Sequence, residues 1–316
     1  MKLSQLINYR NQLRALDLTP MKDNVQHKVD HVLHLASGYP GDTQEFFLQL
    51  TQKGQHISQS ICDFELQIDH LKQDIDHQIR AIETPYFLRS YDLYAEISNE
   101  TLEDIINRQT TPSASVDYLR TRVQRLNTWL YPAMILRPGN ETFINDMVAC
   151  DPLYLVDLKH ELLAPALNRY NNTYQNRLRT YVISEQSPDA MLHQLPDQQF
   201  GMILAYNYFN FRPFEVIRQW LAELFVKLQP GGMLLLTFND CDNDKAVMLV
   251  EQNYCCYTPG HLVKQLAQTL GYEIQHEWSD QGPSTWLELQ RPGTLTSLRG
   301  GQALAQIIPK AVAESK

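Results

Sequence analysis

The chain has 316 residues, of which 43% are hydrophobic and 20% charged, and its 36 Asp and Glu outnumber its 27 Lys and Arg to give a net charge of -9. Broad nucleic-acid and anionic-membrane surfaces need clustered Lys and Arg, so this balance argues against both kinds of partner. The length allows two domains, each with its own core.

Neither export nor metal binding is predicted. The first residues lack a signal-peptide pattern, and no stretch approaches the roughly 20 apolar residues of a membrane helix, so we expect a cytoplasmic protein. The cysteines are odd in number and form no C-x-x-C pair, which predicts reduced thiols and no zinc site; they are Cys62, Cys150, Cys241, Cys255 and Cys256.

Residues 1–112 are predicted to form an all-helical domain. One helix is expected over residues 24–37, and a turn at residues 38–41 separates it from a long helix over residues 42–84. The apolar positions of the long helix alternate steps of four and three, which is a heptad pattern; they are Ile57, Ile61, Phe64, Ile68, Leu71, Ile75, Gln78 or Ile79, and Ile82. Two interpretations stand: a hairpin within the chain, and a coiled coil that makes a homodimer through residues 42–84.

The end of this domain is predicted from turn and breaker residues. Pro85 should end the long helix, because the residue before a proline resists the α region. A short helix is expected from Ser98 to about Arg108, and the polar segment 110–115 should link the two domains.

Residues 113–293 have the pattern of an α/β domain. After an amphipathic helix that starts at Ser115, short apolar runs alternate with amphipathic helical stretches, which is typical of a parallel sheet. Strands are expected over 132–136, 153–156, 179–183, 200–205, 233–238, 272–278 and 285–290. Helices are expected over 161–170, 213–228 and 258–271, with a short one that ends at Ala149.

The last two expected strands distinguish between fold families. The loop 279–284 is too short for a crossover helix, so the two strands should be antiparallel neighbours. A dinucleotide dehydrogenase would instead continue with a helical crossover and parallel strands. A doubly wound sheet closed by an antiparallel strand is the layout of class I methyltransferases.

Three segments resemble the class I S-adenosylmethionine-dependent methyltransferases. Residues 228–236 (LQPGGMLLL) resemble the L-x-P-G-G turn before their fifth strand, residues 257–273 their last helix with its glycine stop, and residues 195–203 their approach to strand four. Residues 151–157 (DPLYLVD) are similar to a segment of methyltransferase-like proteins of marine phages, which would place the protein in a host cytoplasm. The resemblance covers about residues 115–292 and implies a seven-stranded, Rossmann-like α/β sheet.

The resemblance also implies a site for S-adenosylmethionine. Asp157, which ends the second strand, would accept the ribose hydroxyls, and the loop after the third strand would meet the adenine amine. The residues expected to bind the cofactor are Arg137, Gly139, Asn140, Asp157, Leu158, Glu185, Gln186 and Ala205.

The first loop departs from the family pattern, an acidic residue followed by x-G-x-G-x-G. Ile135 stands at the acidic position, Arg137 and Glu141 stand at the outer glycines, and only Gly139 matches. Glycine leaves room for a cofactor that an arginine side chain takes up. The substitutions therefore indicate cofactor binding that is weakened, rerouted or lost.

Residues after the fourth strand are the catalytic candidates. Tyr206, Asn207 and Asn210 stand where the family lines its methyl-transfer pocket, and aromatic rings and amides suit a flat or cationic group. Core and rim packing explains the aromatic residues equally well. His193 and the pair Asn239-Asp240 are expected at the rim.

Two functions follow. The first is methyl transfer from S-adenosylmethionine to a small-molecule or protein acceptor. The second is a catalytically inactive methyltransferase-fold module that acts in assembly or scaffolding through its N-terminal helices. Residues 294–316 are expected to form a tail with a docking helix around Leu304, Ile307 and Ile308.

Overall fold

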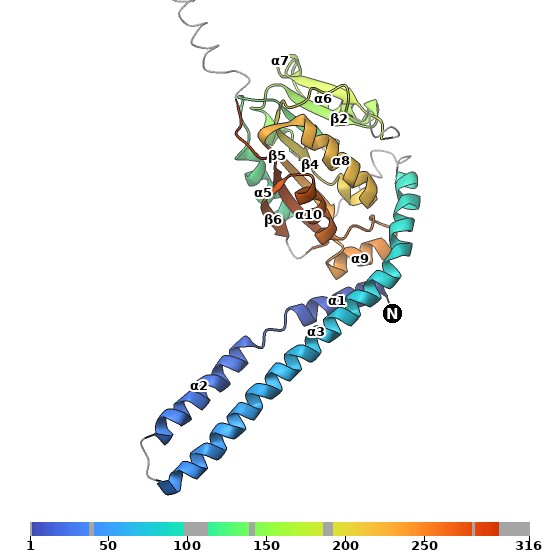
Figure 1. Cartoon of the computed structure of the whole chain (residues 1–316). Coiled ribbons are helices and arrows are strands. Elements are labelled where there is room, and N and C mark those ends of the chain that lie inside the picture. Colours follow the sequence, from blue (N-terminus) through green and yellow to red (C-terminus); the bar gives the residue numbers. More distant parts are fainter. Residues whose placement is uncertain are drawn as a thin grey trace, which may run out of the picture. The chain divides into compact units, whose positions relative to one another are not determined.

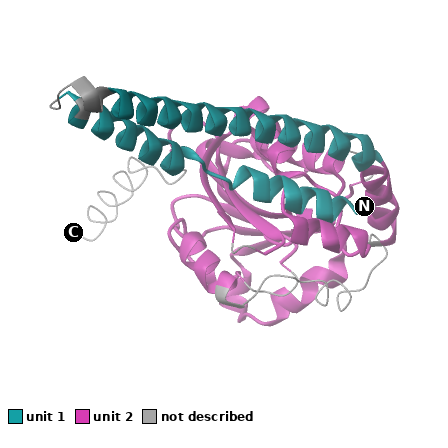
Figure 2. Cartoon of the chain, turned by 90° about the horizontal axis from the view of Figure 1, so that it is seen from below, with its two compact units in different colours: residues 1–84 teal, residues 85–316 magenta. Residues whose placement is uncertain are grey.

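A computed structural model describes residues 2–37, 41–97, 113–138, 143–185, 192–279 and 282–296. The chain divides into two compact units, residues 1–84 and residues 85–316, which we call the helical unit and the sheet unit (Figure 2). The sequence placed a domain boundary at residue 112, and residues 98–112, including the expected helix from Ser98 to Arg108, lie outside the described part. Among the described residues no helix is both long and apolar enough to cross a membrane.

The helical unit is built from α1 (Leu3–Arg14), α2 (Thr19–Ala36) and the first part of α3 (Gly41–Ile97) (Figure 1). Helices α2 and α3 form an antiparallel hairpin, in which Lys22 Nζ lies 3.2 Å from Glu65 Oε2. Gly54 allows their close approach, because a Cβ at this position would overlap a methyl group of Val29. The predicted hairpin is therefore present, while α1 was not predicted.

The expected end of the long helix at Pro85 is wrong, since α3 continues through this proline to Ile97. A proline inside a helix removes a backbone donor and costs about 3 kcal/mol. Packing within the sheet unit offsets this cost: the ring of Phe87 lies 4.9 Å from that of Tyr257, and the hydroxyl of Ser90 accepts a hydrogen bond from the Tyr257 amide. Tertiary contacts thus override the local signal.

The sheet unit contains the predicted seven-stranded sheet. Its order is β3-β2-β1-β4-β5-β7-β6, and β7 runs antiparallel to both neighbours, so the predicted antiparallel closure is confirmed. The strands are β1 (Ala133–Leu136), β2 (Leu153–Asp157), β3 (Leu178–Val182), β4 (Phe200–Ala205), β5 (Leu228–Asn239), β6 (Glu273–Ser279) and β7 (Ser284–Gln290).

Helices cover both faces of this sheet (Figure 1). One apolar cluster packs α8 (Phe214–Lys227) and α10 (Gly260–Thr269) on the first face. A second packs α5 (Ser113–Gln124) and α6 (His160–Asn168) on the other. The shorter elements are η1 (Asn145–Met147), α7 (Asn172–Gln175), η3 (Phe209–Phe211) and α9 (Asp244–Glu251).

Two local expectations are corrected. The helix expected to end at Ala149 is represented in the described residues by the single turn η1. β5 begins at Leu228, directly after α8, so the Pro-Gly-Gly segment lies inside the strand and does not precede it. Gly231 has φ of 81° there, and its backbone amide donates to the carbonyl of Arg291 at 2.8 Å. The strand therefore begins before residue 233, where the sequence predicted its start.

Candidate functional site

Four polar side chains meet at the carboxyl edge of the parallel strands. Arg137 follows β1, Asp157 ends β2, Glu185 follows β3 and Tyr208 follows β4. The strand order reverses between β1 and β4, and open α/β sheets bind their ligands at the carboxyl ends beside such a reversal. We call this group the cleft cluster.

Arg137 and Asp157 form a buried, loosely matched ion pair. The Arg137 backbone has φ of 52°, a conformation that favours glycine, and its Nε lies 4.0 Å from Asp157 Oδ1, with side chains 8% and 0% exposed. That carboxylate oxygen accepts the amide of Leu158 at 2.7 Å. Burial lowers the pKa of Arg137 and raises the pKa of Asp157.

Both side chains of this pair retain unused hydrogen-bonding capacity. Among the described residues, Nε and Nη1 of Arg137 and Oδ2 of Asp157 have no hydrogen-bond partner. A buried polar group without a partner costs about 1–3 kcal/mol. Oδ2 of Asp157 could therefore accept a further hydrogen bond, although the guanidinium of Arg137 lies beside the same carboxylate.

Glu185 is the most heavily bonded member of the cleft cluster. Its carboxylate accepts hydrogen bonds from four side chains, with donor distances of 2.6 to 3.4 Å; they are Tyr94, Tyr208, Arg212 and Trp220. Burial raises its pKa, but the charge of Arg212 and these donors more than offset the effect and hold the pKa at about 2. Glu185 is therefore ionised at neutral pH, and its acceptor sites are used by the chain itself.

The Tyr208 ring lies between the two ion pairs of the cluster. The guanidinium carbon of Arg212 is 3.5 Å from the ring centroid, and that of Arg137 is 5.5 Å from it. Cations are attracted to an aromatic face at these distances. The ring thus connects the Arg137–Asp157 pair to the Arg212–Glu185 pair, and two cations balance two anions.

The catalytic candidates after β4 make structural contacts. Tyr206 is 7% exposed and packs edge-on against Phe143, with ring centroids 4.7 Å apart. The backbone amide of Asn207 donates to Thr237 Oγ1 at 2.6 Å, and the side-chain Nδ2 of Asn210 donates to Ser284 Oγ at 3.0 Å. Core packing therefore describes the ring of Tyr206, and Ala205 before it is fully buried, while a catalytic role for Asn207 and Asn210 stays a prediction.

Several expected site residues are not brought to the cluster or lie outside the described part. Gly139, Asn140 and Gln186 are outside the described residues, while His193 is exposed. Asn239 is buried, and its Nδ2 donates to the carbonyls of Ala246 and Cys256.

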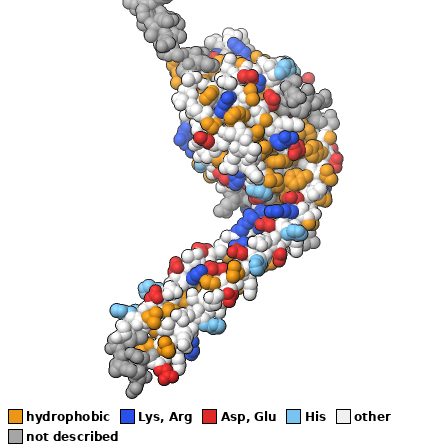
Figure 3. Space-filling model, in the orientation of Figure 1, with side chains coloured by type: hydrophobic (Ala, Val, Ile, Leu, Met, Phe, Trp, Pro, Cys, Tyr) orange, Lys and Arg blue, Asp and Glu red, His pale blue; other side chains and the backbone are white. Residues whose placement is uncertain are grey.

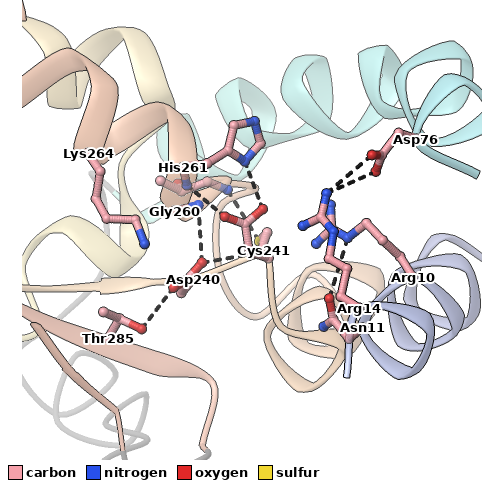
Figure 4. A network of polar contacts seen from close by, with 12 residues as sticks. Arg10, Asn11, Arg14, Asp76, Asp240, Cys241, Gly260, His261, Lys264 and Thr285 are labelled. Atoms are coloured by element: carbon pink, nitrogen blue, oxygen red, sulfur yellow. Dashed lines mark hydrogen bonds and ion pairs between the residues drawn. The ribbon is translucent and has the colours of Figure 1, made fainter. Parts of the chain in front are cut away.

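Asp240 caps a helix. Its Oδ1 accepts the amide of Gly260 at 3.1 Å, at the start of α10, and its Oδ2 accepts the hydroxyl of Thr285 at 2.9 Å (Figure 4). Burial raises its pKa. Asp240 therefore connects the N-terminus of α10 to β7.

Sequence reasoning missed Tyr94, Arg212 and Trp220. Tyr94 lies in α3 beyond the expected stop at Pro85, and Trp220 falls in the apolar face of α8. Arg212 is 1% exposed and stands between η3 and α8. No local pattern marks these three residues, because they become a site only when distant segments meet.

Comparisons with known proteins concern the fold. No protein-family profile matches the sequence, and no curated protein matches it. Solved structures resemble part of the chain at 8–14% identity and TM-scores below 0.5.

Three of these structures illustrate the likeness. An O-methyltransferase family protein from Burkholderia thailandensis has 14% identity and a TM-score of 0.44, with 57% of each chain covered. An S-adenosylmethionine-dependent methyltransferase from Leishmania major has 12% identity and a TM-score of 0.46, with 65% of this chain and 83% of that chain covered. A geranyl diphosphate C-methyltransferase from Streptomyces coelicolor has 8% identity and a TM-score of 0.45, with 57% and 79% covered. The first match spans little more than half of the Burkholderia protein.

Proposed function

We propose that the sheet unit is a methyltransferase-fold module that serves in assembly, and that its own side chains fill the place of the cofactor. The observation that carries this proposal is the buried Arg137 guanidinium, which lies against Asp157 in place of a loop glycine. Among the residues that the structure describes, Arg137 and Glu185 do not fit S-adenosylmethionine in the manner of the class I enzymes.

Electrostatics supports the proposal. The cofactor carries a sulfonium cation, and the Asp157 carboxylate that could attract it is already opposed by the Arg137 guanidinium. The adenine amine would need an acceptor from the loop after β3, whereas Glu185 already accepts five hydrogen bonds. A carboxylate offers about four lone-pair sites, so this acceptor is saturated.

The same hydrogen bonds indicate a structural role for Glu185. Tyr94 of α3 donates to Glu185 Oε2 at 2.6 Å, which ties the last turns of α3 to the loop after β3. Hydrogen bonds to a charged group contribute about 1.5–3 kcal/mol. We infer that the sheet unit is a platform that holds the carboxyl end of α3, the helix that runs on into the helical unit.

Methyl transfer from S-adenosylmethionine is the second candidate, and one observation favours it. Asp157 Oδ2 is buried and without a partner among the described residues, as a ribose-binding carboxylate would be before the cofactor arrives. This candidate requires Arg137 to leave the cleft cluster, and its acceptor would be a small molecule or a protein.

Calorimetric titration of the full chain with S-adenosylmethionine and S-adenosylhomocysteine separates the two candidates. We expect no binding heat and no thermal shift. Micromolar binding that is lost in Asp157→Ala but retained in Asp197→Ala, which changes a carboxylate that is 60% exposed, would overturn the proposal in favour of methyl transfer.

Hydrogen exchange tests the platform role. Tyr94→Phe removes the hydroxyl that binds Glu185, so the amides of residues 86–97 should exchange faster. The matched control is Tyr91→Phe on the same helix, because Tyr91 is 43% exposed. Equal protection of these amides in both variants would contradict the role given to Glu185.

A further inference from the structure

The apolar residues of α3 in the helical unit form two stripes. Ile61 and Ile68 are each 7% exposed and belong to the interior of the hairpin. A second stripe, which we call the outer stripe, remains 38–52% exposed; it consists of Leu50, Ile57, Phe64 and Leu71. Figure 3 shows hydrophobic side chains on the outside of the hairpin, interspersed with charged and polar ones. The predicted heptad pattern is therefore only partly used inside the hairpin.

The outer stripe has the geometry of a helix contact. Its residues are spaced by seven, so they stay on one side of the helix along its length. A stripe of large apolar side chains on a surface marks an interaction site more often than chance exposure does. In the described part of the chain these four side chains keep about 38–52% of their surface exposed.

We propose that the outer stripe binds the outer stripe of a second copy of the chain, with the two α3 helices antiparallel around a two-fold axis at Phe64. In this register Phe64 meets its own counterpart, and Ile57 of each copy meets Leu71 of the other. A two-fold contact is self-complementary: if a residue of the first copy contacts a given residue of the second, the same contact occurs with the two copies exchanged. Two hairpins packed side by side form a four-helix bundle.

The charged residues beside the outer stripe favour an antiparallel arrangement of the two α3 helices. Lys53 and Asp74 are both exposed and flank the outer stripe near its two ends. With the axis at Phe64, Lys53 of one copy comes level with Ile75 of the other and so lies within one residue, about 1.5 Å along the helix, of its Asp74. The two-fold axis repeats this contact. An in-register parallel pair would bring Lys53 level with Lys53 and Asp74 level with Asp74, so it would form no pair of opposite charges at these positions.

This inference rests on the proposed function in one respect, since an assembly role needs a surface through which copies meet. It draws only on the helical unit, so cofactor titration and self-association fail independently. If the protein is monomeric and does not bind the cofactor, only the outer-stripe dimer is refuted. If it is dimeric and binds the cofactor, only the proposed function is refuted.

Sedimentation velocity of the full chain over a concentration series tests the contact. We expect a reversible dimer, and Phe64→Glu should raise its dissociation constant at least about tenfold. Leu66→Glu is the matched control: Leu66 is 59% exposed, and two residues along an α-helix turn by about 200°, so it points away from the stripe. A wild-type chain that stays monomeric, or two variants with equal effects, would refute the proposal.

A charge exchange tests the register. Lys53→Asp alone and Asp74→Lys alone should each weaken the dimer severalfold. The double variant should restore it, because the new acidic side chain at position 53 of each copy then lies near the new basic side chain at position 74 of the other. A parallel dimer would show no such restoration. A full chain that dimerises only after residues 297–316 are removed would assign the outer stripe to the tail and overturn the proposal.

Discussion

Replacing Glu185 by glutamine tests the cleft cluster most directly. The substitution keeps the shape and one acceptor oxygen but removes the charge opposite Arg212, which is 1% exposed. The new amide group would also face Arg212 Nη2 and the Tyr94 hydroxyl with donors of its own. A buried guanidinium would then have no anion within hydrogen-bonding distance.

Two estimates of the cost agree. Removing one partner of a buried ion pair costs about 3–5 kcal/mol. Independently, the pKa of Glu185 falls from 4.5 to about 2, and each pKa unit corresponds to 1.36 kcal/mol, so the ionised carboxylate contributes roughly 3 kcal/mol at neutral pH. The pKa is lowered in the folded state, so this stability is present above pH 4.5 and is lost as the pH falls towards 2.

Urea denaturation at several pH values measures the effect. Glu185→Gln should lower the free energy of unfolding by roughly 3 kcal/mol at pH 7, and the difference from wild type should shrink below pH 4.5. Glu215→Gln is the control, since Glu215 is 50% exposed in its pair with Arg218 and should change stability by less than about 1 kcal/mol. Equal effects of the two substitutions, or a gap independent of pH, would refute the arrangement around Glu185.

Three further substitutions test the fold that holds the cluster. Asp240→Ala removes the acceptor for the first amide of α10 and for Thr285, so unfolding free energy should fall by about 1–2 kcal/mol; thermal denaturation within 1 °C of wild type would contradict this. Gly232→Ala should cost about 1–3 kcal/mol, because its Cβ would lie 2.7 Å from the carbonyl oxygen of Phe200; a neutral result in urea would refute this close approach. Pro85→Ala should raise stability by about 1–3 kcal/mol and keep helicity, and a loss of helicity by circular dichroism would contradict the continuous α3.

The positions of the strands and the antiparallel pairing of the last two followed from local features of the sequence. Apolar runs of strand length alternate with helical stretches, and the loop 279–284 is too short for a crossover. The sheet has this arrangement, with β7 antiparallel to β5 and β6. Loop length decides strand direction without any knowledge of tertiary contacts, so this part of the fold was predictable.

The length of α3 was not predictable in the same way. Pro85 is a strong local stop signal, and the contacts that override it come from Tyr257, more than 160 residues away in the sequence. The cleft cluster has the same property. Asp157 and Glu185 were expected at strand ends, but the donors to Glu185 lie on α3, after β4 and on α8. A local pattern cannot show that an acceptor is already occupied.

The two ion pairs of the cleft cluster are unequal, and this difference bears on function. The Arg212–Glu185 pair is close, at 3.0 Å, and fully bonded, whereas the Arg137–Asp157 pair is 4.0 Å apart with unpartnered atoms on both sides. Among the described residues, Asp157 therefore retains an oxygen that a ligand could engage, whereas the oxygens of Glu185 are already used by side-chain hydrogen bonds. The occupied state of Glu185 supports the structural role that we propose for the sheet unit, because a carboxylate that already holds α3 and α8 is not free to bind a ligand.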